Sequence, residues 1–259
     1  MSDLRSKIEK RRAFFGSFVK SNSPAMVEVM GHAGMDYVLL DMEHSPMAID
    51  HLEHLIRAAE TAGIAAVVRV SGISEAEILH PLDKGAAGLL VPMVNTPEAA
   101  REVVHHARFA PAGARGVDIY ARSGKYGAIP KAEYLAGANA ATVLAVQVEG
   151  SEGLANVAEI VRVEGIDSVY VGPYDLSQSM GIPGQIDDPR VIEAAGKVAS
   201  EVSAAGKAAG IYVDDVATAA RYLKLGFTFI TLCVDTAIFF RTCRALRGEL
   251  LEAASGAGN

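Results

Sequence analysis

Short hydrophobic runs alternate along the whole chain with longer stretches in which apolar residues recur at a helical period. Most of the short runs are rich in Val, Ile, Leu, Phe or Tyr and are bounded by turn-forming residues, which is typical of buried strands. The predicted strands lie at residues 14–19, 37–41, 65–70, 88–92, 142–148, 168–172, 208–213 and 228–233. Two of the helical stretches between them end at Gly63 and Gly226, as expected of helix C-caps.

Eight strand–helix units in 259 residues predict a single (β/α)8 TIM barrel spanning residues 1–259 as one domain. An open doubly wound sheet is the alternative, but no strand is followed by a Gly-x-Gly-x-x-Gly turn. No linker rich in Pro, Gly or Ser divides the chain. We interpret the longest irregular segment, residues 110–130, as an active-site loop.

Charge and cysteine content indicate which partners and which cellular compartment to expect. A net charge of −7 argues against nucleic acid or an anionic membrane as a partner, and no apolar run is long enough to span a bilayer. The first 20 residues carry Asp3 and Glu9 and no cleavage site, so we interpret them as a solvated helix before the first strand. The two cysteines, Cys233 and Cys243, favour a reducing, cytoplasmic compartment without disulfides.

Polar side chains follow the predicted strands at the end where barrel enzymes place their active sites. The residues expected there are Asp41, Glu43, His44, Arg69, Gln147, Glu149 and Asp175. Gln147 and Glu149 are two residues apart and therefore point to the same side. Each has a structural alternative, because the carboxylates could cap helices and Arg69 could be a buried counter-ion of Asp41. Several ionisable groups at one end of one barrel are costly to desolvate, which favours a binding site.

Two carboxylates without a cysteine or histidine cluster favour a hard divalent cation such as Mg²⁺ or Mn²⁺. Such a cation keeps open positions for a chelating 2-oxo acid and can stabilise an enolate at the keto oxygen. Arg69 would add positive charge near that oxygen, and His44 would be the general base or its relay. The pattern predicts carbon–carbon bond making or breaking beside a ketone.

Several segments closely resemble the HpcH/HpaI family of class II pyruvate aldolases, which includes 4-hydroxy-2-oxoheptanedioate and 2-keto-3-deoxy-sugar-acid aldolases. The similar segments are LLDMEHSP, VVRV, LDKGAAGLLVPMVNT, RGV, VQVEG and VGPYDLSQSMGIPGQ. The resemblance runs in order from about residue 13 to residue 245, and the block that contains GPYDLS is its most specific part.

The resemblance implies a role for each site residue. The implied metal ligands are Glu149 and Asp175, holding Mg²⁺, Mn²⁺ or Co²⁺. The implied catalytic residues are His44 as base, Asp83, which raises the basicity of His44, and Arg69, which stabilises the transition state. The implied substrate-binding residues are Gln147, Gly172, Pro173, Tyr174 and Asp175.

The resemblance also implies the substrates and the assembly. It predicts cleavage or formation of 4-hydroxy-2-oxo acids, giving pyruvate and an aldehyde, with no nucleic-acid or membrane partner. It predicts a homo-oligomer, a hexamer built as a trimer of dimers, in which the helix from Asp235 onward packs on a neighbouring subunit. Met42 and Tyr174 depart from well-characterised members, which carry a glycine and a small residue there. The aldehyde stays open, and its candidate contacts are Asp118, Tyr120, Arg122, Lys125 and Tyr126.

Other functions remain as alternatives at this stage. An oxaloacetate decarboxylase or a citrate-lyase-type enolate lyase would use the same metal and the same enolate. A barrel that binds a 2-oxo acid without turnover would keep the carboxylate pair but lose the base, whereas His44, Asp83 and Arg69 are all present here. A Schiff-base aldolase needs an interior lysine, and the strand-adjacent candidate, Lys207, precedes its strand.

Overall fold

Eight parallel strands close into a barrel in sequence order in the computed structural model, which describes residues 4–256. The strands are β1 (Phe14–Val19), β2 (Tyr37–Asp41), β3 (Ala65–Arg69), β4 (Gly88–Val91), β5 (Val143–Val148), β6 (Ser168–Val171), β7 (Ala208–Val213) and β8 (Phe229–Val234). All eight predicted strands are present, with ends shifted by at most one residue. The predicted TIM barrel is confirmed; residues 1–3 and 257–259 of the predicted domain lie outside the described residues.

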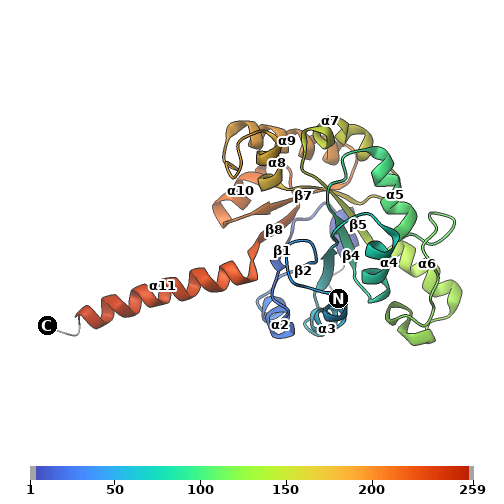
Figure 1. Cartoon of the computed structure of the whole chain (residues 1–259), viewed down its shortest axis with the longest axis horizontal. Helices are drawn as coiled ribbons and strands as arrows, with labels where there is room; N and C mark the ends of the chain where they lie inside the picture. Colours follow the sequence, from blue (N-terminus) through green and yellow to red (C-terminus); the bar gives the residue numbers. More distant parts are fainter. Residues whose placement is uncertain (1–3, 257–259) are drawn as a thin grey trace.

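Helices surround the barrel on the outside (Figure 1). The helices are α1 (Leu4–Glu9), α2 (Pro24–His32), α3 (Ile49–Thr61), α4 (Glu75–Asp83), α5 (Pro97–Ala107), the 3₁₀ turn η1 (Arg122–Gly127), α6 (Lys131–Ala141), α7 (Ser151–Ile160), α8 (Pro173–Ser179), α9 (Pro189–Ala204), α10 (Val216–Lys224) and α11 (Asp235–Gly256). The inner faces of α2 to α5 and of α7 to α10 form, with the outward-facing strand residues, the larger of two hydrophobic clusters. Each crossover helix therefore returns the chain to the N-terminal end of the barrel, as parallel strands require.

The barrel interior is filled by aromatic rings that pack against glycines. The rings of Tyr37 and Tyr170 pack edge-on against Phe229, with centroids 5.0 and 5.5 Å away. A side chain at Gly16 would come within 2.6 Å of the Tyr37 ring, and one at Gly210 would collide with the Tyr170 ring. Bare backbone at these two positions makes room for the large rings, so the interior is a packed core rather than a pore.

The N-terminal helix α1 closes the bottom of the barrel. Leu4 and Ile8 are buried in the same cluster as the interior strand residues, so the expectation of a fully solvated helix is wrong. Arg5, on the same helix, donates to both carboxylate oxygens of Asp167 at 3.1 and 3.0 Å. The helix is short, so its apolar pair and this bidentate ion pair attach it to the barrel.

The long segment between α5 and α6 lies at the N-terminal end of the barrel. It follows a helix that descends from the end of β4, and α6 then leads into the start of β5. Arg122 of this segment donates to the carbonyl of Lys84 at 2.9 Å and pairs with Glu60, both near the lower ends of their helices. Within one chain this segment lies opposite the strand C-termini, so the prediction that residues 110–130 border the active site is wrong for a single subunit.

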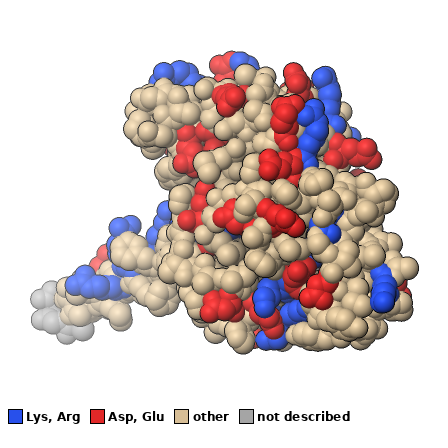
Figure 2. All heavy atoms as spheres, turned by 45° about the vertical axis from the view of Figure 1, so that its right-hand side comes forward, with Lys and Arg blue, Asp and Glu red and all other residues tan. Residues whose placement is uncertain are grey.

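Helix α11 projects away from the barrel, and only its first part reaches β1 and β8 (Figure 1). In space-filling view it forms a separate arm beside the compact body (Figure 2). The large apolar residues that it exposes are Ile238, Phe239, Phe240, Leu246, Leu250 and Leu251. Packing of this helix on a second subunit stays a prediction. Among residues 4–256, no helix combines the length and hydrophobicity that crossing a bilayer requires.

Candidate active site

The alternation of the strands brings the predicted polar residues together at the C-terminal end of the barrel. Asp41 ends β2, Arg69 ends β3, and the two residues are paired in register. Gln147, near the end of β5, is paired in register with Tyr170 of β6. Both Gln147 and Glu149 are buried, and they meet on the barrel axis side, as their spacing predicted.

A buried ion-pair network surrounds the Arg69 guanidinium. Its Nε and Nη2 each donate to the fully buried Asp41 carboxylate at 2.9 Å, and its Nη1 lies 3.1 Å from Glu43 Oε2. Lys20 Nζ is 3.5 Å from Asp41 Oδ2. Burial opposes the charge of Asp41, but the hydrogen bonds and charge of Arg69 outweigh it and lower the pKa of Asp41. The counter-ion alternative for Arg69 is thus correct, and the same network fixes its guanidinium at the site.

Glu149 lies in a cradle formed by a glycine, an amide and a backbone N–H. Gln147 Nε2 donates to Glu149 Oε2, and the N–H of Met93 donates to Glu149 Oε1 at 2.7 Å. A Cβ on Gly172 would lie 2.9 Å from Gln147 Nε2 and 3.1 Å from Glu149 Oε2. The buried Gln147 Oε1 has no hydrogen-bond partner among the described residues. An unpartnered buried oxygen beside a carboxylate is a feature of a site that binds a ligand or an ion.

The electrostatics of this cradle favour a cation. Burial raises the pKa of Glu149 to about 7 against the hydrogen bonds of Gln147 and Met93, and the charges of Asp175 and Glu43 act in the same direction as burial. Burial likewise raises the pKa of Glu43. A divalent cation would relieve this repulsion, so the donor set fits a hard metal ion. Within residues 4–256 no group of three His, Cys, Asp or Glu side chains could hold a metal ion, and the pair Glu149 and Asp175 stays a prediction.

The helix-capping alternative for the carboxylates is wrong. The N-cap of α8 is Gly172, and Asp175 lies inside the first turn of that helix. The N-cap of α7 is Gly150, which has no side chain, and Glu149 is bonded instead to Gln147 and Met93. Neither carboxylate therefore serves as an N-cap.

A cavity of about 310 Å³ opens on these residues. Its lining residues are Phe18, Lys20, His44, Arg69, Gln147, Tyr170, Gly172, Pro173, Tyr174, Asp175, Tyr212 and Val234. The sequence analysis missed five of them: Phe18, Lys20, Tyr170, Tyr212 and Val234. Lys20 could have been found, because it is the first charged residue after β1. The others are apolar or aromatic strand residues, whose sequence signal is the same as that of core residues.

His44 and Asp83 are not brought together within the chain. The His44 side chain is 58% exposed at the mouth of the cavity, and its Nε2 is 4.0 Å from Glu43 Oε2. Asp83 is the last residue of α4, at the opposite end of the barrel, where it accepts from Arg115 Nη2 at 2.7 Å. The predicted pairing of Asp83 with His44 therefore does not form inside one subunit.

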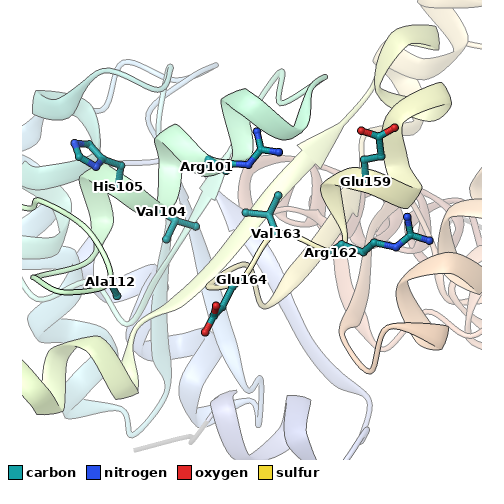
Figure 3. A pocket seen from close by; sticks show the side chains of 8 residues that line it. All are labelled: Arg101, Val104, His105, Ala112, Glu159, Arg162, Val163 and Glu164. Carbon is teal, nitrogen blue, oxygen red and sulfur yellow. The ribbon is translucent and has the colours of Figure 1, made fainter.

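Two larger cavities lie elsewhere, and polar side chains from the strand C-termini do not meet in them. One, of about 450 Å³, lies between α5 and the end of α7 (Figure 3). Its Glu159 and Glu164 point in opposite directions, and its Arg101 is already paired with Glu98 at 2.7 Å. The other, of about 900 Å³, lies at the N-terminal end beside α1 and the segment that contains η1. Neither receives side chains from the strand C-termini, where barrel enzymes carry their chemistry.

Comparison with known sequences decides the family. The model of the HpcH/HpaI aldolase/citrate lyase family matches residues 15–242. The chain belongs to this family. It is therefore related to carbon–carbon lyases over nearly its whole length, as the similar segments of the sequence predicted.

Named members of the HpcH/HpaI family are similar along their full lengths. The 2-keto-3-deoxy-L-rhamnonate aldolase of Salmonella typhi is 39% identical, covering 91% of this chain and 88% of that enzyme. The hydroxypyruvate/pyruvate aldolase of Pseudomonas aeruginosa is 38% identical, covering 95% and 91%. The crystal structure of a family protein from Burkholderia cenocepacia superposes with a TM-score of 0.92 at 32% identity, covering 96% of this chain and 99% of the other.

Proposed function

We propose that this family member is a metal-dependent aldolase that forms or cleaves 4-hydroxy-2-oxo acids, giving pyruvate and an aldehyde. The observation that carries the proposal is the cradle of Gln147, Glu149 and Gly172 beside Arg69, at the C-terminal end of the barrel. It combines an acidic pocket for a cation with a fixed guanidinium, the two features that enolate chemistry requires. We place the enzyme in the cytoplasm, in keeping with its two free cysteines.

Glu149 and Asp175 would hold the divalent ion, Mg²⁺, Mn²⁺ or Co²⁺. When bound there, the ion would supply Lewis-acid polarisation of the keto oxygen of a 2-oxo acid. Gln147 would orient the substrate through its unpartnered Oε1 or its amide group. The start of α8 around Gly172, Pro173 and Tyr174 would bind the substrate carboxylate, because the first turn of a helix presents free N–H groups. Pro173 itself has no N–H to donate.

Two side chains would carry the proton and charge chemistry. Arg69 presents a guanidinium that Asp41 and Glu43 hold in place, so it can stabilise negative charge on the keto oxygen without reorganising. His44 stands at the mouth of the cavity, where an incoming aldehyde or the hydroxyl of a 4-hydroxy-2-oxo acid would arrive. It would move the proton of that hydroxyl.

The role of Asp83 requires a second copy of the chain. Asp83 and His44 lie at opposite ends of one barrel, so a head-to-tail neighbour would have to present its Asp83 to this His44. The exposed apolar face of α11 supports a further contact between copies. We propose a hexamer built as a trimer of dimers, and light scattering that gives 27.2 kDa at micromolar concentration would contradict it.

Metal removal tests the central proposal. Chelation should abolish both aldol cleavage and the exchange of pyruvate C3 protons in D₂O, and added Mg²⁺, Mn²⁺ or Co²⁺ should restore both. Borohydride with pyruvate should leave the protein mass unchanged, whereas a trapped lysine adduct would show Schiff-base chemistry. Exchange without acceptance of any aldehyde would instead favour oxaloacetate decarboxylation or another enolate lyase.

Subunit mixing tests the shared site. His44→Ala and Asp83→Ala should each be nearly inactive alone. After dissociation and reassembly in equal amounts, about one quarter of the sites would carry both wild-type residues if neighbours share the site, so activity should reappear. If mixing restores no aldolase activity, Asp83 takes no part in the reaction.

A further inference from the structure

Lys20 lies on the wall of the cavity and is the first residue after β1. Its Nζ is 3.5 Å from Asp41 Oδ2, and among residues 4–256 no other carboxylate lies within 4.0 Å of it. This separation is longer than that of a tight ion pair, and an ammonium carries three N–H groups. Lys20 therefore adds a positive charge to the cavity that Asp41 only partly engages.

The charges around Arg69 balance only when Lys20 is counted. Arg69 Nη2 lies 2.9 Å from the Asp41 carboxylate, and its Nη1 lies 3.1 Å from that of Glu43. One guanidinium between two ionised carboxylates leaves a net negative charge, whereas the Lys20 ammonium makes the group of four neutral. Negative charge that develops on the keto oxygen of a 2-oxo acid meets less repulsion in the neutral arrangement.

The turn that carries Lys20 is held by Asp235, the first residue of α11. Asp235 Oδ1 accepts the backbone N–H of Lys20 at 3.1 Å, and Oδ2 accepts the N–H of Ser21 at 3.0 Å together with the Ser21 hydroxyl. Asp235 is 1% exposed, so water competes little for these bonds. These bonds fix the backbone from which the Lys20 side chain reaches Asp41.

An extra residue in β8 brings Asp235 to this turn. The register of β1 against β8 shifts between Gly16 and Phe18, where β8 advances by one residue more than β1. Cys233 of β8 has a φ of 55°, a left-handed conformation that is unfavourable for a residue with a side chain. Without the extra residue Asp235 would lie about 3.3 Å farther along the strand, out of hydrogen-bonding reach of both N–H groups. The irregularity next to the cavity thus places Asp235.

We propose that Lys20 is a positioning residue of the active site, which Asp235 holds in place and which acts through Asp41 to leave the charge of Arg69 available to the substrate. The proposal rests on the proposed aldolase function and adds a residue outside its metal ligands, its base and its arginine. It also makes the first residue of α11, the helix that leaves the barrel in Figure 1, a support of the cavity.

Substitution of Lys20 tests the charge. Lys20→Met should lower kcat/KM for pyruvate C3 proton exchange in D₂O at saturating Mg²⁺ by roughly 10-fold, the effect of one unit charge at short range inside a protein. Lys20→Arg keeps the charge and should retain most of the rate. Lys197→Met makes the same chemical change on the exposed face of α9 and should not alter exchange. Exchange within about twofold of the wild type in a folded Lys20→Met protein would overturn the proposal.

Asp235→Asn tests the support of the turn. Asparagine keeps one oxygen acceptor, so exchange should slow by roughly 3- to 10-fold in an otherwise wild-type protein. In the Lys20→Met background the same substitution should cause no further loss of exchange, although it should lower the midpoint of denaturant unfolding equally in both backgrounds. An equal loss of exchange in both backgrounds would show that Asp235 does not act through Lys20.

Oxalate binding separates this proposal from the aldolase function. Oxalate is a planar dianion that resembles the enolate of pyruvate, and calorimetry with Mg²⁺ present measures its affinity without turnover. Lys20→Met should weaken oxalate binding by roughly 10-fold, and Lys20→Arg should keep it within about twofold. If the wild type does not exchange pyruvate protons, the aldolase function fails, and the oxalate affinities alone then decide the role of Lys20.

Discussion

The two ends of this barrel differ in how their charged side chains are paired. At the N-terminal end, Leu4 and Ile8 seal the interior, and the charges sit in closed pairs such as Arg5 with Asp167 and Arg115 with Asp83. At the C-terminal end, burial and the charges of Asp175 and Glu43 raise the pKa of Glu149, and the buried Gln147 Oε1 is unpartnered among the described residues. The charges at the N-terminal end are paired, although the buried Nε atoms of Arg5 and Arg115 make no hydrogen bond within residues 4–256, whereas carboxylates repel one another at the C-terminal end. Substitutions should therefore affect mainly stability at the N-terminal end and mainly activity at the C-terminal end.

The largest expected effect comes from Glu149→Gln. Because it removes a carboxylate that would hold the cation, pyruvate proton exchange should fall by roughly 10³-fold or more. The thermal midpoint of the metal-free protein should not fall, since the change also removes a buried, repelled charge. Glu159→Gln, on the exposed face of α7, is the matched control and should change neither quantity. A large loss of metal-free stability would make Glu149 a structural residue.

His44→Ala should slow aldol cleavage and leave pyruvate proton exchange intact. Aldol cleavage should slow by roughly 10²- to 10⁴-fold, the range for loss of a general base. Metal binding by calorimetry and pyruvate proton exchange should persist, because the cradle and Arg69 are untouched. If both reactions fall together, His44 acts on the enolate rather than on the substrate hydroxyl.

Arg69→Met should combine a loss of activity with a loss of stability. It leaves the fully buried Asp41 carboxylate without its bidentate partner, which typically costs about 3–5 kcal/mol in the free energy of unfolding. Denaturant unfolding measures this change. The double variant Asp41→Asn/Arg69→Met should regain most of the stability and none of the pyruvate exchange. If the double variant recovers pyruvate proton exchange, Arg69 stabilises the fold and has no role in the reaction.

Asp167→Ala changes an ion pair at the N-terminal end of the barrel and should have the smallest effect of the four substitutions. The Asp167 carboxylate accepts from Arg5, from Arg108 at 3.3 Å and from the N–H of Leu144 at 2.9 Å. Losing these bonds should lower the free energy of unfolding by about 1–3 kcal/mol and leave kcat/KM unchanged. A drop in kcat/KM at full saturation with metal would show that the two ends are coupled.

The strands were predictable because their signal is local. Buried β-branched runs between turn residues are sufficient to locate all eight to within one residue, and the period of two places Gln147 and Glu149 on one face. The pairing of Arg69 with Asp41 was foreseen only as an alternative, because a bidentate pair depends on the register of two strands, and its contact with Glu43 was not foreseen. The burial of Leu4 and Ile8 depends on the open end of a closed barrel, which no short window of sequence reveals.

The misplaced loop shows a different limit. Residues 110–130 have a functional composition, but they follow a helix rather than a strand, and in a barrel that order determines the end at which a loop lies. The order is readable in the sequence, whereas the length of the segment, on which the prediction rested, does not indicate the end of the barrel at which it lies. The placement of Asp83 follows the same rule, because it ends a helix that begins after β3. Its predicted role concerns a relation between subunits, which a single chain does not contain.

The glycine–tyrosine pairs of the barrel interior constrain the order in which this sequence can change. At Gly210 the three atoms nearest to an added Cβ all belong to the Tyr170 ring, so we expect a larger residue to become tolerable once Tyr170 has been reduced. At Gly16 the backbone carbonyl of Tyr37 blocks the space as well, so reducing that ring opens no route. One interior position is therefore conditionally variable and the other is closed, and a mutational library would recover replacements at position 210 only in company with a second change.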